Sequence, residues 1–398
     1  MKTLGSADVT VIGGGAVGTA VAAYLALAGV DTALVERGEY ASGSSRRCDG
    51  HAVTYDSPPG FFSRFCKLGL DLFPEMIPLL PCDIQFEPEG IGLLVDDERD
   101  METVLATYEG KKKEGVPVAL WDQKDLRHHE PNVADRVLAC LNFTGDAKLN
   151  PMRLAFGLAQ LARDNKAKTF PFTRVDGFSV DGGGAVNAVE TDRGAILTKR
   201  VVLCAGVWTP LLGQMAGVSI PIRPRQGHVL VTERLSGLIG KNYAEYGYLA
   251  AKGGKTRAGV TPAMENFGVA MVLEPSHEGT VLIGSSRRYV GMNTEPHPAV
   301  MQAMAQRCMH FFPAFEKTRL IRAYAGLRPA SPDGKPIISP THVKGLFVAS
   351  GHEGNGIGLS LVTGKLVSQM LTGGEPILDI SPLHIDRFGL NPKALPAD

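Results

Sequence analysis

The sequence lacks the closely spaced cysteine pairs that iron–sulfur clusters and structural zinc sites require. Its six cysteines lie far apart, and no two of them form a Cys-x-x-Cys pair: Cys48, Cys66, Cys82, Cys140, Cys204 and Cys308. Thiols scattered in this way suit a reducing compartment. We therefore expect a cytoplasmic protein with no metal centre of its own.

Net charge and long apolar runs are also missing. The 398 residues carry 41 basic and 41 acidic side chains, so no overall field attracts nucleic acid or acidic lipid. No uninterrupted apolar run is long enough to span a membrane. The apolar residues near the N-terminus follow Asp8 and lead into a glycine-rich turn, so we assign them to the fold and not to a targeting segment. Nucleic acid and membranes are thus not expected partners.

Glycine, in contrast, is abundant, with 47 residues. Gly13, Gly15 and Gly18 follow the apolar run 9–12, which reads as a buried strand, and a helix is predicted to begin near Ala16 and Val17. The first glycine allows a tight turn, the second lets backbone approach a pyrophosphate, and the third lets the helix pack on the strand. The positive end of the helix would face that pyrophosphate.

An acidic residue stands where this motif needs one. A second strand is predicted over residues 32–35, and Glu36 follows it directly, where its carboxylate can accept from the ribose hydroxyls of an adenosine. The alternative is a glycine-rich turn that serves packing alone, and the position of Glu36 argues against it. The segment therefore predicts a bound dinucleotide.

The end of the chain repeats the pattern of strand, glycine loop and helix. Residues 345–350 form an apolar strand, 351–356 a glycine loop, and 357–371 a helix with small residues on its early face. We expect this unit to return to the cofactor domain more than 300 residues after the first one. Backbone N–H groups at the start of its helix would then lie near the other end of the coenzyme.

The intervening chain predicts a mixture of helices and strands. Helices are expected at 61–80, 101–114, 150–165 and 298–312. A pair of strands around a glycine turn is expected at 84–90 and 91–95, and further strands at 170–175, 185–191 and 195–203. Residues 221–232, 269–273 and 281–284 alternate like strands of a half-buried sheet, so we expect a mostly antiparallel second sheet that forms a lid over a pocket.

Over nearly its whole length the chain resembles the FAD-dependent D-amino-acid oxidase and glycine oxidase superfamily. The matching pieces are residues 11–18, 35–36, 203–208, 325–329 and 351–358. The resemblance implies an α/β fold in which a Rossmann-like FAD-binding domain is interleaved with a mostly antiparallel β-sheet substrate domain. The FAD-binding parts would be residues 1–82, 146–220 and 323–398, and the substrate parts 83–145 and 221–322.

Further stretches look like a narrower branch of this superfamily. Residues 130–132, 150–154 and 227–234 are similar to flavin subunits of opine dehydrogenases, D-hydroxyproline and related imino-acid dehydrogenases, and hydrogen cyanide synthase. Members of that branch pass electrons to partner subunits with a pyridine-nucleotide-disulfide-reductase-like fold and an iron–sulfur module. The resemblance thus implies a heteromeric complex.

The resemblance also implies roles for individual residues. Arg328, in the Ala-Gly-Leu-Arg-Pro motif, would hold the substrate carboxylate, because a guanidinium matches a carboxylate bidentately. A structural ion pair under the flavin is the alternative. The residues expected to contact FAD, besides the glycine turn, are Glu36, Arg37, Ser44, Ser45, Arg46, Val175, Ala205, Gly206, Trp208, Gly326, Arg328, Gly354, Asn355, Gly356 and Ile357.

The sequence departs from glycine oxidase around the predicted substrate site. Gly354 stands where a second arginine is expected, and Val272 where an aromatic lid residue is expected, so a roomier site is predicted. Candidates for lining that site are His51, Tyr246, Tyr248 and Arg288. Each has an equally plain alternative: a packed histidine, core tyrosines, and a surface arginine.

The favoured function is FAD-dependent dehydrogenation of a secondary amine or D-amino acid, such as an opine or D-hydroxyproline, to an imine. The alternative enzyme is an oxidase of the glycine, sarcosine or D-amino-acid type that makes hydrogen peroxide. A third possibility is a flavoprotein that serves only electron transfer or assembly. No obligatory acid or base can be named, because such oxidations can proceed by hydride transfer from a neutral amine.

Overall fold

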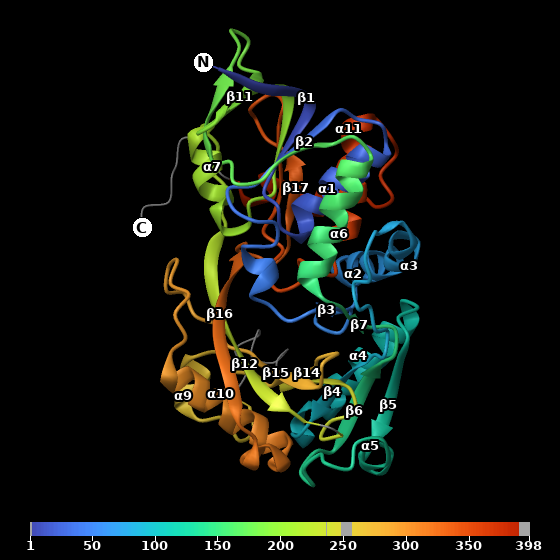
Figure 1. Ribbon diagram of the computed structural model, residues 1–398. Helices are drawn as coiled ribbons and strands as arrows, with labels where there is room; N and C mark the ends of the chain where they lie inside the picture. Colours follow the sequence, from blue (N-terminus) through green and yellow to red (C-terminus); the bar gives the residue numbers. More distant parts are fainter. Residues whose placement is uncertain (1, 236, 248–256, 390–398) are drawn as a thin grey trace.

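The computed structural model describes residues 2–235, 237–247 and 257–389. Two sheets divide these residues, one above the other in Figure 1. No helix within the described ranges is long and apolar enough to cross a bilayer. Tyr248, one of the predicted substrate residues, lies outside them.

The upper sheet is built around the predicted glycine unit. Its main path runs β17–β18–β11–β1–β2–β8, with β9 and β10 added beside β11. The bounds are β1 (Thr3–Ile12), β2 (Thr32–Val35), β8 (Lys168–Phe170), β9 (Val175–Val180), β10 (Val186–Thr191), β11 (Gly194–Leu203), β17 (Ile337–Pro340) and β18 (Leu346–Ser350). β1 pairs in parallel with both β2 and β11, and β11 in parallel with β18. Near the C-terminus, β18 is therefore separated from β1 by a single strand, β11.

Three helices cover one face of this sheet. α1 (Ala16–Leu27) packs against both α6 (Pro151–Asp164) and α11 (Ser360–Thr372). The Asn150 side chain accepts hydrogen bonds from the N–H groups of Met152 and Arg153, which caps α6 as the Asn-Pro sequence predicts. One apolar core joins these helices to the sheet.

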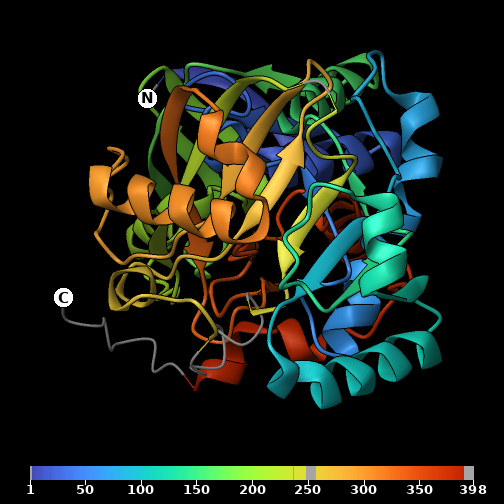
Figure 2. The same cartoon turned by 90° about the horizontal axis from the view of Figure 1, so that it is seen from below.

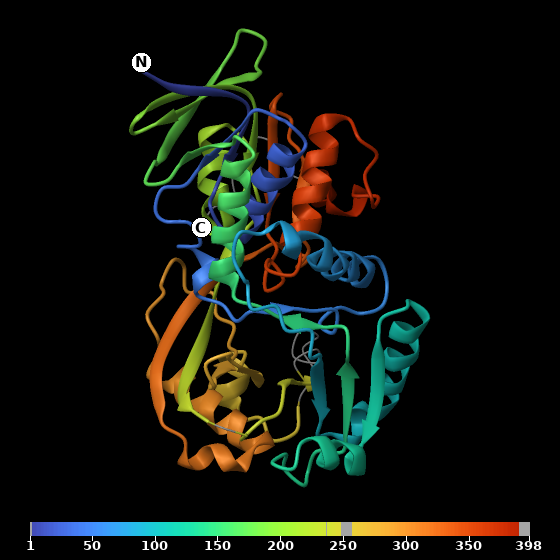
Figure 3. The same ribbon diagram turned by 45° about the vertical axis from the view of Figure 1, so that its right-hand side comes forward.

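The lower sheet is mostly antiparallel, with the order β16–β12–β15–β14–β13–β4–β6–β5. Among the strands that the structure describes in this sheet, only β4 and β13 pair in parallel. The bounds are β4 (Ile91–Val95), β5 (Val118–Asp122), β6 (Ala139–Phe143), β12 (Arg223–Arg234), β13 (Asn242–Glu245), β14 (Val272–Pro275), β15 (Thr280–Gly284) and β16 (Leu320–Ala330). A two-stranded sheet of β3 (His51–Ala52) and β7 (Ala147–Lys148) lies between the two large sheets in Figure 3.

Helices flank the lower sheet on its outer side. They are α4 (Met101–Lys113), α5 (Gln123–His129), α9 (Pro262–Asn266) and α10 (Pro298–Phe311). Figure 2 shows α10 (orange) and α4 (cyan) on different sides of this half of the molecule. Val300, Met304 and Phe311 of α10 pack into the core of the lower sheet. The long strands β12 and β16 rise from that sheet toward the upper one (Figure 1).

Two local expectations were wrong. Residues 84–90 do not pair with β4; apart from a single bridge at Glu87 they form no strand, and β4 pairs with β6 and β13 instead. Pro88 has no N–H to donate to a ladder, which explains the failure. The helix expected over 61–80 is broken into α2 (Phe61–Asp71), α3 (Phe73–Met76) and the 3₁₀ turn Ile77–Leu79. Pro74 and Pro78 are the second residues of the two later pieces, as expected where proline is accepted in a first helical turn but cannot continue a preceding helix.

Candidate active site

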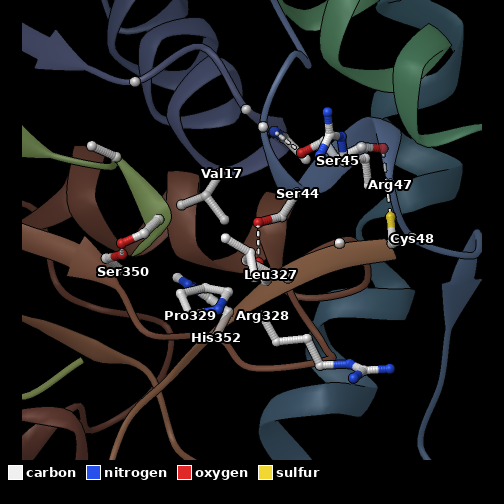
Figure 4. Close-up of a pocket in the computed structure, with 18 of the residues that line it drawn as sticks. Val17, Ser44, Ser45, Arg47, Cys48, Leu327, Arg328, Pro329, Ser350 and His352 are labelled. Carbon is white, nitrogen blue, oxygen red and sulfur yellow. Dashed lines mark hydrogen bonds between the residues drawn. The ribbon is translucent and has the colours of Figure 1, made fainter. Parts of the chain in front are cut away.

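A deep cleft of about 370 Å³ lies where the two sheets meet. Its walls come from the β1–α1 turn, the loop 42–49, the residues after β11, the middle of β12, the C-terminal part of β16, and the turn that follows β18. Figure 4 shows Val17, Ser44 and Ser350 around one part of this cleft, with the Arg328 side chain extending away from Ser350. The two glycine units singled out in the sequence therefore line one common cavity.

The β1–α1 turn has a backbone path that only glycine can follow. Gly13 has φ +116°, and a Cβ added to it would lie 2.5 Å from the carbonyl oxygen of Cys204. A Cβ on Gly18 would lie 1.8 Å from the carbonyl oxygen of Gly13. The turn is thus pressed against β11 on one side and against its own helix on the other. This close packing aims the N-terminus of α1 at the cleft.

Glu36 holds this turn from the end of β2. Its two carboxylate oxygens accept hydrogen bonds from the N–H groups of Gly14 (2.7 Å) and Gly38 (2.8 Å), and the residue lines the cleft. Beside it, Ser45 Oγ accepts from the N–H of Ala16 at 3.1 Å. The Ser44 hydroxyl donates to the carbonyl of Leu327 at 2.6 Å, which ties the loop to β16 (Figure 4).

Replacing Glu36 with alanine is expected to weaken FAD binding by about 10- to 100-fold. The N–H groups of Gly14 and Gly38 would lose their charged acceptor, and a loss equal to one such hydrogen bond, about 1.5–3 kcal/mol, corresponds to about that factor. Titration of the flavin-free protein with FAD, followed by flavin fluorescence, measures the change. Glu39→Ala, an exposed acid three residues later, is the matched control and should bind FAD normally.

The turn after β18 forms the wall opposite the β1–α1 turn. His352 is buried and pairs through Nε2 with the Thr363 hydroxyl at 2.9 Å, and burial lowers its pKa to about 3, so it stays neutral. Asn355 donates to the Asp56 carboxylate at 3.3 Å. The helix begins at Ser360, so Ile357 lies in the turn before it and not in its first turn as expected.

Arg328 lies on β16 and is held by the strand beside it. Its Nη1 donates to the carbonyl of Ser286 at 2.9 Å. The guanidinium lies over Gly227 of β12, where an added Cβ would be only 2.1 Å from Nη1. The Arg328 guanidinium can therefore lie here because Gly227, on the neighbouring strand β12, has no side chain.

His228, also buried in the cleft wall, supports the same corner. The N–H of His297 donates to its Nε2 at 3.1 Å, so Nδ1 carries the proton that is shared with the Ser286 hydroxyl at 2.8 Å. Burial, helped by the charges of Arg288 and Arg328, lowers the pKa of His228 to about 4. His228 is therefore neutral, and Ser286 connects it to Arg328.

Most of the predicted site residues line this cleft. They are Gly13, Gly15, Ala16, Val17, Glu36, Arg37, Ser44, Ser45, His51, Val175, Ala205, Gly206, Trp208, Gly326, Arg328, Gly354, Asn355, Gly356 and Ile357. Gly18 supports the turn from behind. The Arg37 guanidinium lies over the Trp208 ring, 4.0 Å from its centroid.

Three predicted residues do not line it. Arg46 is exposed, and Arg47 takes the place beside the cleft instead. Tyr246 is buried with its hydroxyl 3.2 Å from the Thr107 hydroxyl. The Arg288 guanidinium lies over the Phe267 ring, 5.5 Å from its centroid. Arg46 ends the 3₁₀ turn Ser44–Arg46, whereas Tyr246 and Arg288 lie outside the strands and contact Thr107 and Phe267, which do not line the cavity.

Sequence reasoning missed Asp49 and Glu274. Asp49 lines the cleft, and Glu274 lies behind His51, with its carboxylate 3.1 Å from His51 Nε2. The only signal was a carboxylate at the end of the apolar run 269–273, where a buried acid needs a partner. Neither spacing nor motif could identify that partner.

The residues present fit an FAD molecule, since the turn has no room for a Cβ at Gly13 or Gly18, and Glu36, which would accept from the ribose hydroxyls, lines the same cleft. Comparison with known families decides the identity. The model of the FAD dependent oxidoreductase family matches residues 8–370. The chain belongs to this family. The resemblance predicted from the sequence is therefore confirmed. The predicted cofactor, FAD, is confirmed with it.

Individual relatives agree with the family. The hydrogen cyanide synthase subunit HcnC of Pseudomonas aeruginosa is 30% identical over 370 residues, covering 89% of this chain and 82% of that protein. Glycine oxidase of Geobacillus kaustophilus is 26% identical and covers 96% of this chain and 97% of that one. The crystal structure of L-proline dehydrogenase from P. horikoshii superposes with a TM-score of 0.86, at 23% identity, over 96% of this chain and 98% of that one. The chain is an FAD-dependent amine or amino-acid oxidoreductase with a glycine-oxidase-like fold, as expected.

Proposed function

We propose that this FAD-dependent oxidoreductase dehydrogenates an amine that carries a carboxylate, giving an imine that water hydrolyses. Bound FAD supplies the acceptor for the two electrons and the hydrogen of the C–H bond. The observation that carries the proposal is Arg328, whose guanidinium lies at the cleft and is fixed by Gly227 and Ser286. Such a fork binds a carboxylate bidentately and so orients the carbon beside it.

The space around Arg328 supports a substrate larger than glycine. Gly354 lies beside the guanidinium without a side chain, and a Cβ added to it would be 3.9 Å from Arg328 Nε. Val272, which also lines the cleft, is smaller than an aromatic lid residue. We therefore propose an opine, D-hydroxyproline or a similar secondary amine or D-amino acid as the substrate class.

Electron transfer to partner subunits is the favoured fate of the electrons. The HcnC relative is by name a subunit of a larger synthase, which supports a heteromeric complex for this chain as well. The second candidate is an oxygen-using oxidase that releases hydrogen peroxide. The glycine oxidase relatives, which match over nearly their whole length, favour that candidate.

Anaerobic bleaching of the bound flavin tests the function. The purified holoprotein is mixed with a panel of opines, D-amino acids, prolines, glycine and sarcosine. We expect at least one carboxylate-bearing secondary amine to bleach it, with turnover on an artificial dye far exceeding peroxide formation in air. Peroxide produced at the full turnover rate would instead establish the oxidase, and a flavin that no amine bleaches would contradict both.

A further inference from the structure

Three titratable side chains gather beside the cleft at a place that the proposed function does not use. His51 of β3 and Asp49 just before it line the cavity, and Glu274 of β14 lies behind the imidazole. His51 and Glu274 are 8% and 6% exposed. The Glu274 carboxylate also accepts from the N–H of Gly50, at 2.9 Å and 3.2 Å to its two oxygens. The carboxylate is therefore anchored before any substrate arrives.

The geometry is that of an oriented base and not of a metal centre. His51 Nε2 lies 3.1 Å from Glu274 Oε2, whereas Nδ1 faces Asp49 Oδ2 at 4.0 Å. One ligand atom of each of the three residues lies within 4.8 Å of the others, but the two carboxylates approach different nitrogens, so the ring does not offer both of them the same ligand atom at close range. The Glu274 carboxylate favours a positive charge on the ring by its proximity, although Nε2 makes no hydrogen bond, and the other nitrogen is left to accept a proton. Here the accepting nitrogen is Nδ1.

This cluster lies close to the proposed carboxylate site. The thiol of Cys48, which lines the cleft, has a pKa raised by burial and raised further by Asp49 and Glu274, while the charge of Arg328 opposes the rise. Cys48 therefore lies within electrostatic reach of both the cation and the acids. A zwitterionic substrate with its carboxylate on Arg328 would present its ammonium toward the acids.

Burial also prepares Glu274 to hold a proton. It raises the pKa of the Glu274 carboxyl to about 7, although His51 and the Gly50 N–H oppose the rise. The Glu274 carboxylate therefore carries its negative charge above about pH 7 and loses it below. The charged and titratable groups that face this pair from the surrounding elements are Cys48, Asp49, Lys148, Tyr324 and, on the far side of Cys48, Arg328.

We propose that His51 Nδ1 accepts the proton of the substrate ammonium, with Glu274 and Asp49 as positioning groups. The inference rests on the proposed function, because it needs an amine substrate. In this step an N–H bond of the ammonium breaks, an Nδ1–H bond forms, and the electron pair stays on the substrate nitrogen. That lone pair forms the C=N bond when the C–H hydrogen leaves with its two electrons. The positive charge taken up by the ring is stabilised by the carboxylate at Nε2 and by Asp49 beside Nδ1.

The kinetic test compares wild type with His51→Asn in anaerobic flavin reduction between pH 6 and pH 10. At pH 7 we expect the limiting rate of the variant to fall about 10²- to 10⁴-fold, the usual contribution of a positioned base. The deficit should shrink as pH approaches the value at which the free substrate ammonium loses its own proton, because no base is then needed. Glu274→Gln should give a smaller deficit that shrinks in the same way. The matched control is His277→Asn, which replaces an exposed histidine just after β14, the strand that carries Glu274. This variant should behave like wild type.

Binding of an unreactive amine gives a readout that does not depend on turnover. The probe is 2-aminoisobutyrate, which has an ammonium and a carboxylate but no hydrogen on the carbon between them. Calorimetry should find that wild-type binding strengthens about tenfold between pH 6 and pH 8, as the Glu274 carboxylate gains its negative charge. Glu274→Gln should abolish this dependence while leaving the flavin spectrum intact.

Several results would overturn the inference. A His51→Asn deficit that is equal at all pH values would show that the ring serves only packing. A His51→Asn protein that reduces its flavin at the wild-type rate at every pH, with unchanged flavin content and melting temperature, would show the same. A stoichiometric divalent metal, removed by chelation with loss of activity, would replace the base with a metal site. A wild-type holoprotein that no amine reduces would overturn the proposed function too, whereas the first three outcomes leave that function standing.

Discussion

The Arg328→Met variant should raise KM for a carboxylate-bearing amine by about 30- to 5,000-fold, because truncating one partner of a buried charge pair costs about 2–5 kcal/mol. The substrate carboxylate would enter the cleft without its guanidinium, and Ser286 would lose its donor. Misplacement of the carbon would lower kcat as well, because orientation contributes to the rate. Steady-state kinetics with a dye acceptor, together with the flavin-to-protein absorbance ratio, measure both effects.

Two further variants identify the cause of that effect. Arg328→Lys keeps the charge but not the two-pronged geometry, so it should recover only part of the lost affinity. Arg322→Met removes an exposed arginine from the same strand and should leave KM unchanged. If Arg328→Met retains the wild-type KM in the assembled complex, Arg328 is a structural cation and the chain serves electron transfer alone.

The cofactor end of the site was predictable because its constraints are local. The glycines of the β1–α1 turn, the apolar strand before them and Glu36 at the end of β2 all lie within 36 residues. Each requirement is a property of the backbone: a positive φ at Gly13 and close approaches at Gly13 and Gly18. Such requirements leave a signature in residue type and spacing, which the family match then confirmed.

The substrate end could not be predicted in the same way. Glu274 reaches Gly50 and His51 across more than 220 positions, and only the pairing of β14 with its neighbours brings them together. Tyr246 and Arg288 stood in promising stretches, but the alternation of side chains around them was not visible in the sequence. The two arginines of the 287–288 pair also turn toward Gly268 and Phe267. Long-range register, which decides which face a side chain occupies, has no short motif.

Gly18→Ala should abolish stable FAD binding and lower the melting temperature. The added Cβ would lie 1.8 Å from the Gly13 carbonyl oxygen and 3.1 Å from the Cys204 side chain, so backbone must move. Overpacking of this kind costs about 3 kcal/mol or more when no flexible side chain can yield. If FAD binding requires the turn to return to its wild-type path, a penalty of that size lowers the affinity for FAD about 100-fold. Absorbance in the flavin band and thermal unfolding monitored by circular dichroism measure the two effects.

Gly182→Ala is the control that distinguishes the steric clash expected at Gly18 from the general effect of replacing a glycine with alanine. Gly182 lies in the turn between β9 and β10, where an added Cβ meets nothing within 4 Å and φ is not positive. This variant should be yellow and at least as stable as wild type, because alanine restricts the unfolded chain. A yellow, stable Gly18→Ala protein would contradict the structure of the β1–α1 turn itself. That result would mean that α1 does not pack closely against the β1–α1 turn, so this packing could not direct the N-terminus of α1 toward the pyrophosphate.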